Sequence, residues 1–400
     1  MRRSLITFCI LAAAACCAPA RASEHGHKAE VETPPPPPLP PPSQLSNELY
    51  SAIQDLLESQ DRVVDGAAET QTKLLARIEA IVPTLTPEDW KQQRNYRAVV
   101  VYVLAGGAPT AVEALLAEHV VDEKDTPLLA ASIAFAHGEK DKALKLMTTI
   151  DPKRFPPILA GHLALVEGGL LVGSDNKRAS ALFDYARLVM PGSLVEEAAI
   201  RRELAILDPI QEHTRYLTLA ARYQHRFARS PFAPKYWRSL SAAILKGALT
   251  MEPWLLSEYE QLFTDAPQGV GFEFHTALTR ASLLLSSPEM VKAEAKAAGE
   301  AADTPQARER LKVYRALTLS MDGDTAGSAA ELKSIDLSVL KREELSLLRA
   351  LQGVDTRLAD GAPIAKAEPA TESDAEPAIV QSLQQSLAES EALLKRADRP

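Results

Sequence analysis

Histidines, cysteines and paired carboxylates are the residues with which this chain could hold a metal or activate a nucleophile. Its eight histidines stand at no spacing typical of metal ligands. There is no HExxH zinc motif, no GxSxG nucleophile motif and no phosphate-binding loop. His119 shares a predicted helix face with Val112, Leu115 and Leu116, which favours a buried histidine over a ligand. We therefore expect no catalytic residue, no metal site in the fold, no cofactor and no small-molecule substrate.

Residues 1–22 have the pattern of a secretory signal peptide. Met1-Arg2-Arg3 precedes an apolar run, and Ala20-Arg21-Ala22 is typical of a cleavage site. The apolar run is shorter than the roughly 20 residues that span a bilayer. An uncleaved leader that anchors the chain is the alternative. We predict cleavage after about Ala22 and a periplasmic location.

All three cysteines, Cys9, Cys16 and Cys17, lie in this leader, so the mature chain would have no thiol. Acylation of Cys16 or Cys17 is disfavoured because alanine, not leucine, stands three residues before each. Cleavage would expose Ser23-Glu24-His25, whose amine, amide and imidazole nitrogens can bind Cu(II) or Ni(II) in a square plane. Such N-termini are common by chance, so this metal site is only a hypothesis.

A second kind of chemistry, protein recognition, is indicated by the basic and aromatic stretch from Arg215 to Arg238. Arg, Tyr and Trp carry much of the binding energy at interfaces. Just before it, Glu197 precedes Arg201 by four residues, a favourable helical pairing. The predicted partner-binding residues are Glu197, Arg201, Arg202, Arg222, His225, Arg226, Arg229, Lys235, Tyr236 and Trp237. The alternative, core aromatics with solvated arginines on a stable helix, stays open.

Net charge limits the kinds of partner. The whole chain carries −9. The leader contains three arginines and no acids, so its removal takes −9 to −12. This charge disfavours nucleic acid or an anionic membrane as the main partner. We expect contact with a membrane only through a partner protein.

The elements that must position these residues begin after a spacer. Residues 23–45 are predicted to be a disordered, proline-rich spacer, with eight prolines between Pro34 and Pro42. The prolines favour extended polyproline II, which could also bind an aromatic groove. The spacer interpretation is the simpler one for an exported chain.

A helical domain is predicted over 46–358. Leu49, Ile53, Leu56 and Leu57 recur on one helix face. Serine or threonine followed by proline predicts four helix starts, at Thr86, Thr126, Ser287 and Thr304. The run Val99–Val103 is β-branched but lacks alternation, so we expect a buried helix.

The predicted helices form pairs joined by short glycine turns. The pairs are 95–105 with 110–121, 127–136 with 140–149, and 157–172 with 177–189. In the third pair, Ala179, Ala186 and Pro191 follow the spacing of the second helix of a tetratricopeptide (TPR) repeat. The predicted fold class is therefore all-α, a TPR-like α-solenoid of helical hairpins.

Two segments are predicted after this domain. Residues 359–377 are rich in Ala, Pro, Glu and Asp and are expected to be a flexible linker. Residues 378–397 form a predicted amphipathic helix, with Ile379, Leu383 and Leu387 on one stripe. This terminal helix could dock on the helical domain or on a partner.

The chain also resembles a known family. Pro191–Arg202, PGSLVEEAAIRR, resembles a hallmark segment of the periplasmic motility (chemotaxis) protein MotC family. Ala221–Pro234, ARYQHRFARSPFAP, and Leu104-Ala105-Gly106-Gly107 followed by a helix are similar to that family as well. The resemblance extends from about Ser46 to Leu358, is dense over 190–250 and is thin over 250–275 and in the tail.

This resemblance implies a periplasmic protein needed for flagellar rotation that acts on the periplasmic domain of the stator protein MotB. It implies no enzymatic activity and no catalytic residues. The alternative function is a generic TPR-like periplasmic scaffold for cell-envelope assembly. A third, a peptidoglycan hydrolase, would need paired carboxylates in a cleft or a metal triad.

Overall fold

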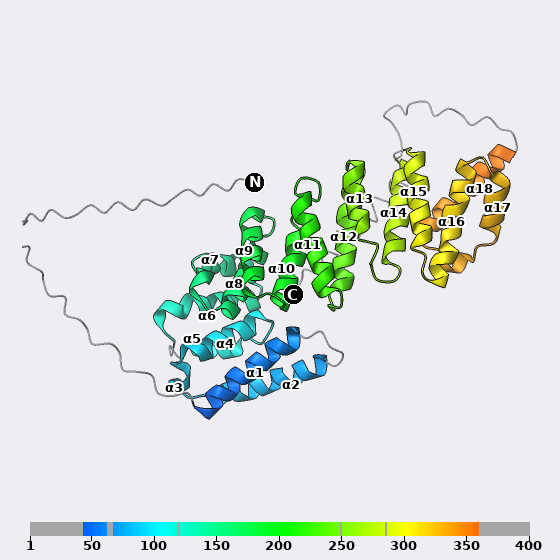
Figure 1. Ribbon diagram of the computed structural model, residues 1–400. Helices are drawn as coiled ribbons and strands as arrows, with labels where there is room; N and C mark the ends of the chain where they lie inside the picture. Colours follow the sequence, from blue (N-terminus) through cyan, green and yellow to red (C-terminus); the bar gives the residue numbers. More distant parts are fainter. Residues whose placement is uncertain (1–42, 62–66, 118–120, 249, 285, 360–400) are drawn as a thin grey trace, which may run out of the picture. The chain divides into compact units, whose positions relative to one another are not determined.

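The computed structural model describes residues 43–61, 67–117, 121–248, 250–284 and 286–359. Within these ranges the chain forms α-helices and short 3-10 helices and no strand, which confirms the all-α fold class (Figure 1). The predicted signal peptide, the Ser23-Glu24-His25 motif, the proline tract and the terminal helix lie outside the described residues. The TPR-like repeat stays a prediction.

The helices follow one another with short connections. The first nine are α1 (Gln44–Asp61), α2 (Ala67–Ile81), α3 (Pro87–Trp90), α4 (Gln93–Leu104), α5 (Thr110–Ala117), α6 (Thr126–Ala136), α7 (Lys140–Met147), α8 (Pro157–Leu171) and α9 (Asn176–Val189). The others are α10 (Leu194–Leu204), α11 (His213–Phe227), α12 (Ala233–Ala248), α13 (Pro253–Gln261), α14 (Val270–Leu284), α15 (Pro288–Glu300), α16 (Pro305–Met321), α17 (Thr325–Lys333) and α18 (Arg342–Ala359). Four 3-10 helices lie between them: η1 (Val82–Thr84), η2 (Glu123–Asp125), η3 (Pro152–Arg154) and η4 (Leu337–Val339).

Two of the four predicted helix caps form. The Thr86 hydroxyl accepts from the Asp89 N–H at 3.3 Å, and the Asp89 carboxylate accepts from the Thr86 N–H at 3.0 Å, a complete capping box. Thr304 accepts from a backbone N–H three residues on. Helices α6 and α15 also start where Thr126 and Ser287 predicted them, so these two helix starts are confirmed, but neither hydroxyl makes a capping hydrogen bond. Thr126 is already the first residue of α6, so its hydroxyl lies inside the first turn.

The apolar run Val99–Val103 lies in α4, so the predicted buried helix is confirmed. These five residues are all buried. The reason is that α4 contacts α1, α6 and α8 as well as its neighbour α5. A helix surrounded in this way is apolar on most of its faces and shows no alternation.

The three predicted hairpins are confirmed as α4 with α5, α6 with α7, and α8 with α9. Gly106 and Gly138 occupy the first two turns with φ of +103° and +71°, a conformation that favours glycine. In the third hairpin Ala179 and Ala186 are fully buried. A Cβ on Gly168 would lie 2.7 Å from the ring of Phe183, so this glycine allows α8 and α9 to approach closely.

The hydrophobic core is divided into clusters that follow the order of the chain. One cluster joins α1 to α8, the next α8 to α10, the third α10 to α14 and the last α14 to α18. Among the described residues, three helices have buried side chains in two clusters each: α8, α10 and α14. Each cluster is thus held mainly by helices that are near one another in the sequence.

Candidate functional site

The predicted partner-binding residues lie on α10, α11 and α12 and in the turn at 228–232. Helix α10 starts at a Ser193 cap, whose hydroxyl accepts from the Glu196 N–H at 3.3 Å. Helix α12 starts at Ala233 with Pro234 in its first turn, where a missing N–H is tolerated.

Helix α10 carries three carboxylates with no exposed surface, those of Glu196, Glu197 and Glu203. A buried carboxylate is unfavourable unless it is paired and hydrogen-bonded. Glu196 and Glu203 share a helix stripe with Ile200, so this stripe is both charged and buried. The three acids are the centre of the site because the basic residues of the neighbouring helices converge on them.

Glu197 connects three elements. It accepts two hydrogen bonds from Arg201, from Nε at 2.9 Å and from a terminal nitrogen at 3.1 Å. The Tyr223 hydroxyl on α11 donates to it at 2.5 Å, and the Ser230 hydroxyl in the next turn at 3.3 Å. Burial, and next the hydrogen bond to Glu197, raise the pKa of Tyr223, so this hydroxyl stays a donor.

Glu196 forms ion pairs with two arginines of α11, Arg222 and Arg226. The Arg222 guanidinium lies 2.5 Å from its carboxylate, and that of Arg226 lies 3.4 Å away. Glu196 also accepts from the N–H of Gly192, which precedes the N-cap of its own helix, at 2.5 Å. Two cations therefore face one buried anion. The arginine side chains keep 38% and 39% of their surface exposed to solvent.

Glu203 joins α10 to α9 and α11. The Arg215 Nε donates to it at 2.8 Å, the Ser180 hydroxyl donates at 2.9 Å, and Arg187 lies 3.3 Å away. Arg215 also donates to Asp184 at 2.6 Å. Burial raises the pKa of Glu203 and outweighs the opposing effect of Arg187 and Arg215.

The aromatic residues of the stretch belong to the core. The rings of Tyr223 and Tyr236 stack at 3.9 Å between centroids. The contacts continue from Tyr236 to Trp237 and from Trp237 to Phe263, with centroids 5.2 and 5.6 Å apart. Phe263 stacks on Phe274 of α14 at 3.8 Å. These rings join α11 and α12 to α14.

The structure thus separates the ten predicted residues into two groups. The buried group cannot offer contact area to a partner, which corrects their placement on a surface: Glu197, Tyr236 and Trp237. The other group is exposed or partly exposed: Arg201, Arg202, Arg222, His225, Arg226, Arg229 and Lys235. Arg202 donates to the Leu165 carbonyl at 3.3 Å, and Lys235 is engaged as well. The binding role of these residues stays a prediction.

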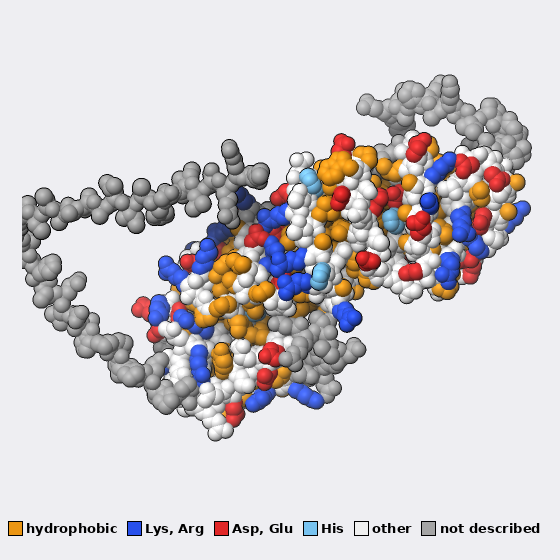
Figure 2. Space-filling view, viewed as in Figure 1, with side chains coloured by type: hydrophobic (Ala, Val, Ile, Leu, Met, Phe, Trp, Pro, Cys, Tyr) orange, Lys and Arg blue, Asp and Glu red, His pale blue; other side chains and the backbone are white. Residues whose placement is uncertain are grey.

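The surface of this region is strongly basic. No acid occurs in residues 213–251, which contain seven Lys and Arg, although the whole chain has more acids than bases. Figure 2 shows Lys and Arg side chains gathered near the position of α10 and α11 in Figure 1. The buried acids of α10 partly neutralise the positive charge of this region, and the arginines that pair with them remain partly exposed to solvent.

Sequence reasoning missed a second buried network, in the last core cluster. The Arg310 side chain, 9% exposed, donates to Glu344 at 2.7 to 3.0 Å and to Glu273 at 2.5 and 3.2 Å. Burial disfavours the Glu273 carboxylate, but the hydrogen bonds from Arg310 and Lys341 outweigh it and lower its pKa. In the sequence, Arg310 lies at helical spacing from Ala307, Tyr314 and Leu317, and a cation on such an apolar face is the feature that could have indicated this network.

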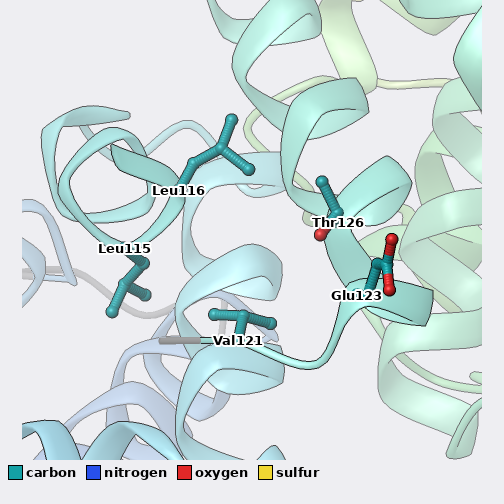
Figure 3. Close-up of a pocket in the computed structure, with 5 residues that line it drawn as sticks. All are labelled: Leu115, Leu116, Val121, Glu123 and Thr126. Carbon is teal, nitrogen blue, oxygen red and sulfur yellow. The ribbon is translucent and has the colours of Figure 1, made fainter. Parts of the chain in front are cut away.

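One hollow of about 270 Å³ lies between α5 and α6 (Figure 3). It is lined by Leu115, Leu116, Val121, Glu123 and Thr126. Among the described residues of this lining, Glu123 supplies a carboxylate and Thr126 a hydroxyl.

The described residues contain neither a metal-binding cluster nor a membrane-spanning helix. In that part of the chain no three His, Cys, Asp or Glu side chains are grouped so that they could hold a metal ion. No helix described there is both long and apolar enough to cross a membrane.

Comparison with known proteins gives a family. The family described as chemotaxis protein MotC matches residues 1–399. The chemotaxis protein MotC of Rhizobium meliloti (strain 1021) is 24% identical over 313 residues, which cover 76% of this chain and 71% of the relative. No solved structure is significantly similar to the chain.

Proposed function

The chain belongs to the chemotaxis protein MotC family, and from that premise we propose that it is a non-catalytic adaptor needed for flagellar rotation. Membership makes it a protein of bacterial chemotaxis and motility. The proposed partner is the periplasmic domain of the stator protein MotB. The proposed location is the periplasm, which the signal-peptide pattern of residues 1–22 supports.

The observation that carries the proposal is the pairing of half-exposed arginines with fully buried acids on α10. Arg222 and Arg226 are held by Glu196 while their outer faces stay open. Side chains that are already fixed lose less conformational freedom when a partner binds. A rigid basic surface of this kind is suited to an acidic surface of another protein.

An adaptor of this type acts by preferring one state of its partner. Binding shifts the partner only by the difference in affinity between its states. We therefore propose that the α10–α12 surface stabilises the working conformation or position of the stator. Such a role needs no chemical step.

The test measures binding of the mature chain to the purified periplasmic domain of MotB from the same cell, by titration calorimetry. Reversing Arg222 or Arg226 would place a carboxylate against buried Glu196 and endanger the fold, so neither is suitable. Arg229→Glu changes an exposed residue of the same surface instead. We expect it to weaken binding at least about tenfold at low salt, with a smaller effect at high salt.

Lys296→Glu is the matched control, because Lys296 is exposed on α15. It should leave the affinity unchanged. Equal losses in both variants would indicate a general charge effect, and absence of binding by the wild-type chain would contradict the proposed partner. In cells, deletion should leave intact but paralysed flagella; envelope defects instead would favour the scaffold for cell-envelope assembly.

A further inference from the structure

We propose that Phe232 is the aromatic anchor of this surface, and that its occupant is an acidic segment of the partner with an apolar side chain among its carboxylates. The inference deepens the proposed function and rests on it. It adds an apolar contact at Phe232 to a surface that the proposed function characterises only by its positive charge.

Phe232 is a large apolar side chain that the fold leaves exposed. It lies in the turn between α11 and α12 with 41% of its surface open, whereas the nearby rings of Phe227, Tyr236 and Trp237 are buried. Pro231 and Pro234, also exposed, flank it. Aromatic side chains in this setting are frequent centres of binding energy.

The ring of Phe232 rests on a fixed cation. The Arg201 guanidinium lies 4.7 Å from the ring centroid. Arg201 is itself held by two hydrogen bonds to buried Glu197. The guanidinium therefore supports one face of the ring, as in other cation–π pairs, and leaves the remaining surface to a partner.

The backbone of Phe232 is fixed by the same carboxylate. The Phe232 N–H donates to the Ser230 hydroxyl oxygen at 3.1 Å, and this hydroxyl donates to Glu197 at 3.3 Å. The Phe232 carbonyl accepts from the Tyr236 N–H at 3.0 Å in the first turn of α12. One buried acid thus orders both the cation under the ring and the turn that carries it. An exposed ring fixed before binding loses little freedom on binding.

Charge selects the occupant. Arg226, Arg229 and Lys235 lie within six residues of Phe232 in the sequence, and no acid occurs between residues 213 and 251. A purely apolar partner would have to desolvate these cations without pairing them, which is unfavourable. A segment in which an apolar residue lies between Asp or Glu residues fits both the ring and the cations.

The experiment uses the full mature chain with two probes. One is the periplasmic domain of MotB; the other is a labelled decapeptide of Glu and Asp with a central Leu, compared with the same peptide carrying Ala. We expect Phe232→Ala to weaken binding of the MotB domain at least about 30-fold, and Phe232→Tyr to retain most of the affinity. Phe232→Ala should also abolish the preference for the Leu peptide. In hydrogen exchange, amides of residues 228–236 should gain protection when either probe binds the wild-type chain.

Trp254→Ala is the matched control, since Trp254 is another exposed aromatic, 56% open on α13. It should change neither affinity, and circular dichroism should show all variants folded. If the MotB domain binds but Phe232→Ala has no effect on either probe, the anchor is overturned and the adaptor stands. If the MotB domain does not bind but the Leu preference depends on Phe232, the adaptor partner is wrong and the anchor stands.

Two further outcomes would assign the surface to a different occupant. Loss of exchange protection in residues 360–400 of free Phe232→Ala would mean that the chain's own acidic tail occupies the anchor. Dissociation of a dimer by the same change, seen in sedimentation, would mean that a second copy does. Either result overturns the assignment to a partner protein.

Discussion

Buried acids show how single residues shape this molecule. Glu196, Glu197 and Glu203 each need a cation or hydroxyl from another position, and the distances of 2.5 to 3.4 Å to their partners show that each has one. Removing one side of such a pair leaves an uncompensated charge, which is more harmful than losing an exposed ion pair. The arginines of α11 therefore stabilise the fold by neutralising buried acids, whether or not they also bind a partner.

The first prediction concerns Arg310, the centre of the second buried network. Arg310→Gln removes the cation and leaves Glu344, which has no exposed surface, without a charged partner. We expect the free energy of unfolding to fall by about 3–5 kcal/mol, measured by urea denaturation followed by circular dichroism. Arg308→Gln, an exposed change on the same helix, should stay within about 0.5 kcal/mol of wild type. Equal losses of unfolding free energy in the two variants would show that the buried ion pair is no more stabilising than an exposed arginine.

The second prediction is a pH dependence. Glu260 on α13 faces Glu294 on α15, and the Glu294 carboxylate lies 2.8 Å from Nδ1 of His275. Burial, and next the charge of Glu294, raise the pKa of Glu260 to about 8. The folded state therefore binds the Glu260 proton more tightly than the unfolded state. The stability that this proton contributes is present below pH 4.5 and is lost as the pH rises from about 4.5 through about 8.

Glu260→Gln removes this titration. We expect the variant to exceed wild type in stability by at least about 1 kcal/mol at pH 8, with the difference shrinking toward pH 5, in thermal or urea unfolding. Glu258→Gln is the control, because Glu258 is exposed on the same helix. A difference that grows toward acid pH would contradict the sign of the shift.

At the scale of elements, close contact between α8 and α9 depends on small residues. Gly168 faces the ring of Phe183, and Ala179 and Ala186 are fully buried on the opposing helix. The Gly168 position has no room for a methyl group, because the ring atoms would lie 2.7 to 3.0 Å from it. Packing, not helix propensity, decides the residue here.

The third prediction therefore compares two helical glycines. Gly168→Ala forces the buried Phe183 ring to move, and we expect a loss of about 1–3 kcal/mol. Gly353→Ala on α18 meets nothing within 4 Å and should gain about 0.5–1 kcal/mol from helix propensity. Thermal unfolding of both variants provides the measurement. A gain at both positions would mean that α8 and α9 can separate without loss.

At the scale of the molecule, the core is a series of clusters linked by shared helices. The first cluster involves α1 to α8 and the last α14 to α18, and they have no helix in common. In such arrays stability is approximately a sum of local terms and contacts between neighbours. A destabilising substitution in the first or the last cluster should therefore reduce stability mainly in the helices of that cluster.

The fourth prediction tests this with two buried leucines. Leu317→Ala on α16 and Leu128→Ala on α6 each remove core volume, at a cost of about 2–5 kcal/mol. Native-state hydrogen exchange should show the loss of protection mainly in α14 to α18 for the first variant and in α1 to α8 for the second. A uniform loss along the whole chain in either variant would indicate a single cooperative unit instead.

Local features of the sequence were sufficient to predict most of the helical architecture. The spacing of apolar residues predicted the helices, and the glycines at 106 and 138 marked two hairpin turns. The Thr86 and Thr304 caps were correct because a cap depends on neighbouring residues only. The Thr126 and Ser287 caps failed because the same residue pair can lie one position inside a helix or leave its hydroxyl unused.

The site needed the tertiary structure, because its decisive contacts join residues far apart in the sequence. Nothing local pairs Arg215 with Asp184, 31 residues earlier, or Arg310 with Glu344, 34 residues later. The same long-range packing buries Tyr236 and Trp237 and leaves Phe232 exposed on Arg201. Composition and spacing alone determined that this region is basic and aromatic; only the packing of α10 against α11 and α12 decided which of those side chains face solvent.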